Sequence, residues 1–229
     1  MLVLAIDTAL DSCAAAVLDT EARQFLAREA LPMKRGHAEA LMPLIARVMA
    51  QFGAGFEALD RIAVTTGPGS FTGLRVGISA ARGLALAAGK DVVGLTTLAA
   101  YAAPQVSKQH DEPILAAIDA RHDHVYCELV SGRGEILVEP AVTPIDETFS
   151  AARYGRLRLV GNAAQILADR WPTHLDPPVL VDAQPAPDIE SVAWGGALAD
   201  PESALPKPFY LRAPDAKPKS EWATTEPRN

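Results

Sequence analysis

The sequence predicts an α/β fold of two lobes that repeat one β-β-β-α-β-α unit. The first half alternates short apolar strands with two long apolar helical segments. A polar stretch follows at 104–113, and the order of strands then restarts at Ile114. The chain of 229 residues is long enough for two lobes with their own cores. This order is that of the ribonuclease-H-like unit, which builds two-lobed sugar kinases and actin-like ATPases, and the analogy concerns the fold alone.

The first lobe is expected to span residues 1–104 and to begin with three strands. Their apolar runs are separated by polar turns, as in β-hairpins, and lie at 2–8, 13–19 and 24–31. A helix over 37–52 should follow. It carries Pro43 in its interior, where proline removes a backbone hydrogen bond, so a kink or a late start is expected.

The stretch 61–89 is the most informative part of the chain. Residues 61–66 alternate as a buried strand does, the turn Gly-Pro-Gly-Ser follows, and residues 72–89 form a long helix whose first N–H groups Ser70 or Thr72 can cap. A glycine turn before a helix can hold an anion, or it can simply let strand and helix pack closely, and both interpretations stay open. The candidate anion-binding residues are Asp7, Gly67, Gly69 and Ser70.

Both long helices of the first lobe are apolar around more of their girth than one sheet face can cover. Either a second helix or a partner protein should cover the remainder, and the residues outside the sheet-facing stripe are the predicted partner interface. Without a partner the same surface can pair with itself, which predicts a homodimer in isolation. The interface residues are Ala38, Met42, Met49, Leu74, Ile78 and Ala81.

A strand at 92–95 and a helix from Thr96 complete the first lobe, and the second lobe is expected at 105–200. Its strands are predicted at 114–119, 125–130, 135–139 and 157–160, and its helical segments at 143–152, 161–170 and 188–198. The segment 201–229 is rich in proline, so it cannot be regular throughout. Its residues 209–211 should anchor a turn, and the part from Lys217 should be mobile.

Composition restricts the possible functions. With 21 basic and 28 acidic residues the net charge is −7, which argues against a broad nucleic-acid-binding surface. The start lacks a signal peptide, and no apolar run is long enough to span a membrane, so a cytoplasmic protein is expected. Cys13 and Cys127 fall in predicted strands and are expected to be buried free thiols.

Four segments together resemble the TsaB (YeaZ) family. They are Ile6-Asp7-Thr8, the eleven-residue run from Gly67 to Gly77, Ile118-Asp119-Ala120-Arg121, and Tyr210-Leu211-Arg212 with Asp215. The resemblance covers nearly the whole chain. It implies a scaffold subunit of the bacterial machinery that transfers a threonylcarbamoyl group to N6 of the adenosine beside the tRNA anticodon. It also implies two partners, the paralogous transferase TsaD and the ATPase TsaE, and contact with tRNA only through them.

The resemblance further implies that TsaD holds its metal through an HxxxH pair, and the matching positions here are Thr97 and Tyr101. Neither supplies an imidazole, so no metal is expected there. The spacing His122-x-His124 on a hairpin turn is more typical of solvated polar residues than of metal ligands. We therefore expect no metal and no cofactor bound by the chain alone, although a nucleotide at a junction between subunits stays open.

No catalytic constellation is found. Ser70 lacks the Gly-x-Ser-x-Gly pattern of a nucleophile, and no P-loop is present. Asp7, Asp11 and Asp119 sit at strand ends, where they either cap turns, which we favour, or act as phosphate or metal ligands. The expected function is a non-catalytic scaffold. The alternatives are an independent actin-like ATPase or small-molecule kinase and, with less support, a metallopeptidase.

Overall fold

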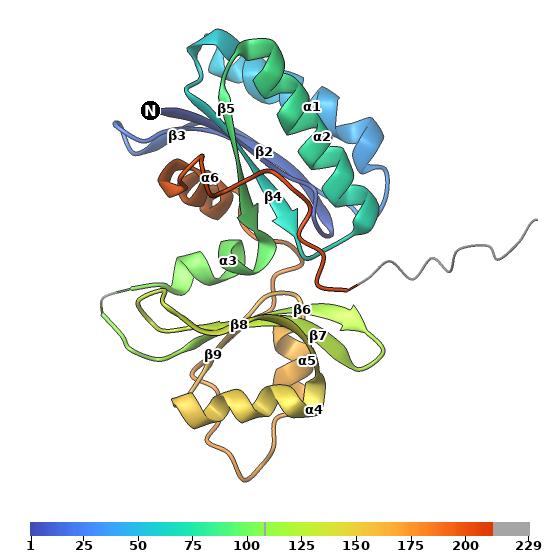
Figure 1. Ribbon diagram of the computed structural model, residues 1–229, viewed down its shortest axis with the longest axis vertical. Helices are drawn as coiled ribbons and strands as arrows, with labels where there is room; N and C mark the ends of the chain where they lie inside the picture. Colours follow the sequence, from blue (N-terminus) through green and yellow to red (C-terminus); the bar gives the residue numbers. More distant parts are fainter. Residues whose placement is uncertain (108, 213–229) are drawn as a thin grey trace, which may run out of the picture.

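The computed structural model describes residues 1–107 and 109–212, which form two lobes (Figure 1). The first half contains, in chain order, β1 (Leu2–Asp7), β2 (Ser12–Asp19), β3 (Gln24–Pro32), α1 (His37–Phe52), β4 (Arg61–Gly67), α2 (Phe71–Ala88), β5 (Asp91–Thr96) and α3 (Thr97–Ala102). The second half contains β6 (Ile114–Arg121), β7 (His124–Val130), β8 (Ile136–Pro144), α4 (Ile145–Thr148), β9 (Arg158–Val160), α5 (Ala164–Asp169), β10 (Leu180–Asp182) and α6 (Ile189–Leu198).

Each lobe is built on one five-stranded sheet. The strand orders are β3-β2-β1-β4-β5 and β10-β9-β6-β7-β8, so the two sheets have the same topology. In each sheet the first three strands pair antiparallel, and the last two add in parallel. The predicted duplicated α/β fold is confirmed. Each half adds one further β-α step to the six-element unit expected from the sequence.

Helices α1 and α2 lie side by side on one face of the first sheet (Figure 1). In α1, Leu41, Leu44 and Ile45 are buried, because their i, i+3, i+4 spacing places them on one stripe facing the sheet. The helix begins at His37, so the late start that Pro43 suggested is wrong. Pro43 lies inside α1 on its exposed side.

The last helix of each half packs against the sheet of the other half. Helix α6 covers the other face of the first sheet, where Val192 packs in a buried cluster with Val3 and Ala5. Helix α3 instead covers the second sheet, where Leu98 clusters with Ile118. The prediction that residues 105–200 form the second lobe is therefore wrong for α6. The apolar pattern of a helix shows that it needs a sheet to cover, but it does not show which sheet.

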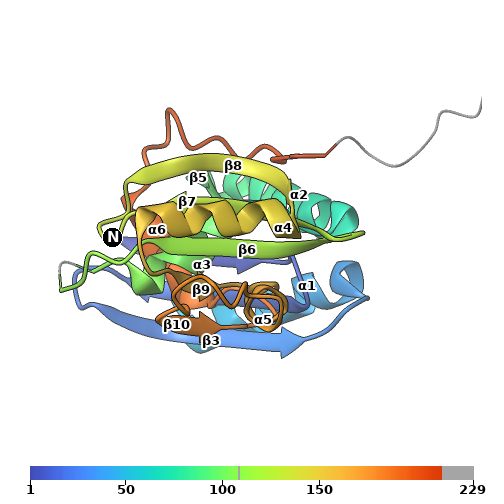
Figure 2. The ribbon, with the colours of Figure 1, turned by 90° about the horizontal axis from the view of Figure 1, so that it is seen from below.

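The outer face of the second sheet is covered by α4 and α5 (Figure 2). Phe149, just after α4, and Leu167 of α5 pack in one buried cluster with Leu115 of β6. The sequence placed the third strand of this lobe at 135–139, yet β8 continues to Pro144. Because β8 is at the edge of the sheet, Pro140 does not end it.

The segment after α6 crosses the first lobe and reaches the second. The N–H of Gly94 donates to the carbonyl of Ala204 at 2.8 Å, and the N–H of Phe209 donates to the carbonyl of Thr66 at 2.8 Å. The anchor expected at 209–211 is therefore present. The mobility expected from Lys217 concerns residues outside those described.

Two predictions about the chain's surroundings can be compared with the described residues. None of the described helices is long and apolar enough to cross a membrane.

Cys13 in β2 and Cys127 in β7 are buried free thiols, one in each lobe, as predicted. Burial raises the pKa of the Cys13 thiol to about 11 and also raises the pKa of the Cys127 thiol. Neither thiol is therefore activated as a nucleophile.

Candidate functional site

The N-terminus of α2 packs directly against the turn that follows β1. The Ser70 hydroxyl accepts the N–H of Gly73 at 3.3 Å, which confirms the expected helix cap. The N–H of Ser70 donates to the carbonyl of Ala9 at 2.7 Å. A Cβ on Gly69 would clash with that Ala9 carbonyl, and a Cβ on Gly73 would clash with the carbonyl of Thr8. Close packing is thus one reason for the glycines of this turn.

Asp7, at the end of β1, is fully buried. Its Oδ1 accepts the Thr65 hydroxyl at 2.5 Å and the Ala9 N–H at 3.1 Å. Its Oδ2 has no hydrogen-bond partner among the described residues. Burial raises the pKa of the Asp7 carboxyl above its ordinary value, and the hydrogen bond from Thr65 opposes that shift. A side chain with no exposed surface cannot contact a ligand unless its surroundings move.

Only two of the four residues predicted to bind an anion reach the space between the lobes. Gly69 and Ser70 line a cleft of about 770 Å³ there. Asp7 is buried, and Gly67 is covered by the backbone of Phe209 and the side chain of Leu74. The four residues therefore do not form one site. The cleft brings the start of α2 together with residues that the sequence did not group with it.

The interlobe cleft has walls from both lobes and is rich in charged side chains. Its first-lobe wall comes from the β1–β2 turn, the β3–α1 turn and the start of α2, and its second-lobe wall comes mainly from the β6–β7 hairpin. Asp11 and Asp119, which the sequence singled out as strand-end carboxylates, both line it. Asp119 Oδ1 accepts the N–H of Arg121 at 2.8 Å, which is the turn-capping role favoured from the sequence. The basic residues lining the cleft are Lys34, Arg35, Arg121 and Arg212.

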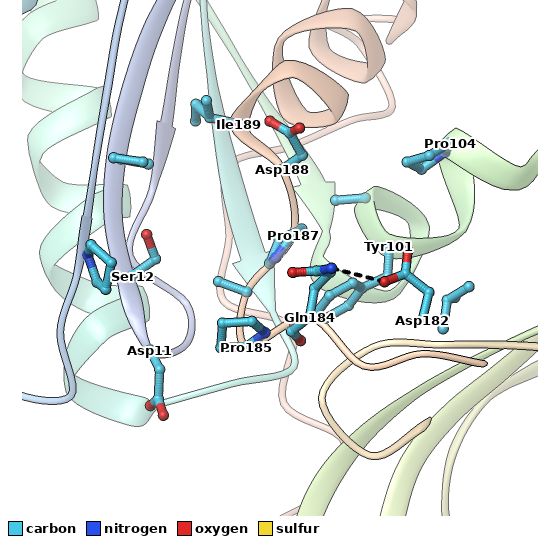
Figure 3. A pocket seen from close by; sticks show the side chains of 16 residues that line it. Asp11, Ser12, Tyr101, Pro104, Asp182, Gln184, Pro185, Pro187, Asp188 and Ile189 are labelled. Atoms are coloured by element: carbon cyan, nitrogen blue, oxygen red, sulfur yellow. Dashed lines mark hydrogen bonds between the residues drawn. The ribbon is translucent and has the colours of Figure 1, made fainter. Parts of the chain in front are cut away.

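A second cavity of about 500 Å³ lies where α3, β10 and the segment before α6 meet the first sheet (Figure 3). Its lining is mainly apolar, with several prolines and the ring of Tyr101. The Tyr101 hydroxyl donates to the carbonyl of Gln184 at 2.9 Å, and the Gln184 amide donates to Asp182 at 3.0 Å. Burial, with the charge of Asp7 next, raises the pKa of Tyr101. The Tyr101 hydroxyl therefore stays protonated and works as a hydrogen-bond donor.

Thr97 and Tyr101, the positions matched to the metal-binding pair of TsaD, lie on α3, and their burial indicates structural roles. Thr97 is fully buried and Tyr101 nearly so. Elsewhere, His124 Nδ1 lies 2.6 Å from the backbone carbonyl of His122, so that ring nitrogen is engaged within the hairpin itself. Within 1–107 and 109–212, no three His, Cys, Asp or Glu side chains are grouped as a metal site would require.

The predicted partner interface is wrong for four of its six residues. Met49, Leu74, Ile78 and Ala81 are buried in the core of the first lobe, in one cluster with the strands below. The glycines of α2 let the helix approach the β1 turn so closely that its apolar stripe is covered by its own sheet and by α1. The other two residues, Ala38 and Met42, are exposed on α1.

An exposed apolar face nevertheless exists on the outer side of these two helices. Met42 of α1 is 49% exposed and Leu86 of α2 is 86% exposed. Exposed small residues extend this outer helix face, which consists of Ala38, Met42, Ala46 and Ala50 on α1 and Gly83, Leu86 and Ala87 on α2. The sequence indicated that the helices had apolar surface to spare. The hydrophobic pattern assigned Ala38 and Met42 to it correctly but added four residues that are buried.

Sequence reasoning also missed the four basic residues of the cleft. They stand at positions 34, 35, 121 and 212, so no local motif unites them. Arg121 and Arg212 belong to the sequence motifs at 118–121 and 210–212, and this was the one signal in the sequence that pointed to them. Only the fold shows that these motifs meet, since Arg212 Nη1 donates to the carbonyl of Ala120 at 3.3 Å.

Comparison with known proteins gives a consistent result. Residues 28–166 match the family model described as TsaD: tRNA N6-adenosine threonylcarbamoyltransferase. The tRNA threonylcarbamoyladenosine biosynthesis protein TsaB of Haemophilus influenzae is 37% identical over 123 residues, covering 54% of this chain and 51% of that protein. TsaB of Escherichia coli is 38% identical over 128 residues, covering 55% of this chain and 53% of that protein. The matched part thus spans about half the length of these curated relatives.

Similarity in structure extends over almost the whole chain. The solved structure of YeaZ from Pseudomonas aeruginosa superposes with a TM-score of 0.74 and 30% sequence identity. The match covers 92% of this chain and 99% of that one. The match therefore extends over both lobes.

Proposed function

The chain belongs to the TsaB (YeaZ) family, and on that premise we propose that it is a non-catalytic subunit of the machinery that makes threonylcarbamoyladenosine in tRNA. A TsaD-like subunit carries out the transfer to N6 of the adenosine, and a TsaE-like ATPase joins the assembly. The observation that carries this proposal is the match to YeaZ over nearly the whole chain, together with the TsaB names of the curated relatives.

The non-catalytic role is supported by how the candidate reactive groups are engaged. The Ser70 hydroxyl caps α2, and Asp7 is buried without exposed surface. Thr97 and Tyr101 stand where, by the resemblance, the family's transferase has imidazole ligands. The Tyr101 hydroxyl donates a hydrogen bond to the backbone carbonyl of Gln184. None of these side chains combines exposure with an activating neighbour among the described residues.

The outer helix face is the proposed contact with the TsaD-like subunit. It belongs to two adjacent helices and exposes Met42 and Leu86, with exposed charged residues such as Glu39 and Arg82 beside them. Small residues between them let a partner helix approach closely. In the absence of that subunit, the same face pairs with a second copy of the chain, which gives a homodimer.

The remaining parts of the proposal concern cofactors and location. The chain binds no cofactor alone, and a nucleotide, if one is used, binds at a junction between subunits. The protein works in the cytoplasm, where its tRNA substrate is modified, and the buried free thiols are consistent with a reducing compartment.

The test combines association and activity. The full chain is tagged and co-expressed with the TsaD-like and TsaE-like proteins of the same organism, and the purified assembly is assayed for threonylcarbamoyladenosine in a tRNA transcript. We expect a complex whose activity is lost when this chain is left out. Turnover of Mg-ATP by the chain alone would instead support the independent ATPase or kinase, and zinc-dependent peptide hydrolysis would support the metallopeptidase.

A further inference from the structure

Four basic side chains converge on the mouth of the interlobe cleft. Lys34 and Arg35 come from the β3–α1 turn, Arg121 from the β6–β7 hairpin and Arg212 from the segment that links the lobes. Two carboxylates also line the cleft. In a chain with a net charge of −7, this is a local reversal of sign. Such a concave basic region attracts anions even on an acidic protein.

Most of this positive charge is not neutralised within the described residues. Lys34 Nζ lies 3.9 Å from Asp11 Oδ2, at the outer limit of an ion pair, and its side chain is 85% exposed. Arg212 donates a hydrogen bond to the backbone carbonyl of Ala120 and forms no ion pair with another described residue. Neither Arg35 nor Arg121 has a carboxylate within 4.0 Å in the part of the chain that the structure describes. Among the described residues, the cleft therefore offers three arginines without a carboxylate partner and one lysine with a distant one.

An aromatic pair stands beside these cations. Phe71 lines the cleft, and Tyr210 stacks on it with ring centroids 5.5 Å apart. The two side chains are 42% and 40% exposed. The guanidinium of Arg75 lies 3.8 Å from the Phe71 centroid and adds a further cation at the same edge. Cations that follow a backbone next to exposed aromatic rings are the pattern by which proteins bind single-stranded nucleic acid.

We propose that the cleft mouth binds the phosphate backbone of an RNA strand, with Tyr210 available to stack on a base. The cations lie on both sides of the cleft and the aromatic pair continues outside it, so the surface suits an extended polyanion better than one small phosphate compound. This inference rests on the proposed function, in which the RNA is the tRNA substrate. The expectation from the resemblance, that the chain contacts tRNA only through its partners, is the opposite prediction, and binding of tRNA to the chain alone distinguishes the two.

The experiment measures binding of a fluorescent tRNA transcript to the full chain, alone and in the complex with its TsaD-like partner. The test variant carries Arg35→Glu and Arg121→Glu. The matched control carries Arg23→Glu and Arg153→Glu, which make the same change in net charge at exposed sites that do not line the cleft. Arg23 also has a positive φ of 52°, close to the 62° of Arg121, so the backbone demands are similar.

We expect the test variant to bind tRNA at least about tenfold more weakly at low salt, and the salt dependence of binding to fall by about one unit for each lost phosphate contact. The control should bind within about threefold of the wild type, since it removes no such contact. Equal weakening in both variants, or an unchanged salt dependence, overturns the inference.

Two further measurements separate the possible causes. Co-purification with the TsaD-like partner is measured for every variant. If the test variant assembles and still binds tRNA normally, RNA binding by the cleft is refuted and the proposed function is unaffected. If the wild type neither assembles nor supports modification, the proposed function is refuted. Inorganic pyrophosphate and ATP are tested as competitors. Tight binding of either to the wild type, lost in the test variant, identifies a small-phosphate site and overturns the RNA assignment.

Discussion

Tyr210 stacks on Phe71 at an interplanar angle of 29°, and this contact joins the C-terminal segment to the start of α2. Arg75 Nε donates to the Tyr210 hydroxyl at 3.3 Å, which holds the ring in place. The two residues are 139 positions apart in sequence. The contact between Phe71 and Tyr210 lies where the C-terminal segment passes from the first lobe to the second, in which Arg212 donates to the carbonyl of Ala120.

The first prediction concerns this contact. Tyr210→Ala should lower the free energy of unfolding by about 1 kcal/mol, because both the ring stacking and one hydrogen bond are lost. The segment should also be cleaved faster by protease around 205–212. Urea denaturation and limited proteolysis measure the two effects. Tyr154→Ala, at a similarly exposed tyrosine of the second lobe, is the control and should leave cleavage at 205–212 unchanged.

The second prediction compares two glycines of α2. Gly73→Ala should destabilise the protein by about 1–3 kcal/mol, because the new methyl group meets the carbonyl of Thr8. Gly83→Ala should stabilise it by about 0.5–1 kcal/mol, because a Cβ there meets no described atom within 4 Å outside its own helix turn and alanine favours a helix. Equal effects of the two changes on urea denaturation would contradict the close approach of α2 to the β1 turn.

Glycines of α2 also illustrate which features of the fold could be predicted from the sequence and which could not. Most strands and helices and the Ser70 cap depend on local patterns, and the sequence predicts these correctly, although it misses the short strand β10 and ends the third strand of the second lobe at 139 instead of at Pro144. The depth at which a helix packs depends on its neighbours. Gly73 and Gly77 bring α2 against Thr8, which buries Ile78, and no pattern within α2 reveals that contact.

The candidate site was less predictable than the fold for a related reason. Arg35, Arg121 and Arg212 belong to three separate segments, and only the packing of the lobes brings them to one cleft. Helix α6 likewise carries an apolar pattern that suits either sheet. Long-range relationships of this kind require the topology, whereas helix caps and turns do not.

The third prediction separates buried from exposed positions of the helix pair. Ile78→Asp should unfold the first lobe or cost more than about 4 kcal/mol, because Ile78 is only 3% exposed and a charge there would be unpaired. Met42→Asp should change stability by no more than about 0.5 kcal/mol. It should nevertheless reduce co-purification with the TsaD-like subunit. Denaturation and pull-down measure the two effects, and normal association of Met42→Asp would refute the outer helix face as the contact.

The fourth prediction concerns the pH dependence of stability that Asp7 causes. Burial raises the pKa of its carboxyl in the folded protein above the ordinary value of 3.8, and nearby His37 opposes the shift. Well below pH 3.8 the group is protonated in both states and adds no pH dependence to stability. As the pH rises from there to the folded pKa, the unfolded chain loses the proton while the folded protein keeps it, so stability falls and then levels off.

Asp7→Asn is the matched variant, because its amide oxygen can still accept from Thr65 and Ala9 while no proton is exchanged. Its other amide atom takes the place of Oδ2, which already lacks a partner among the described residues. Urea denaturation of both proteins from about pH 4 to 8 gives the difference in their free energies of unfolding, in which the titrating groups that do not interact with Asp7 cancel. His37 is the exception, because its charge acts on Asp7. The wild type should lose stability relative to the variant as the pH rises. A difference that stays constant, or that changes in the opposite direction, would show that Asp7 is ionised in the fold at no cost, and its burial would then need another explanation.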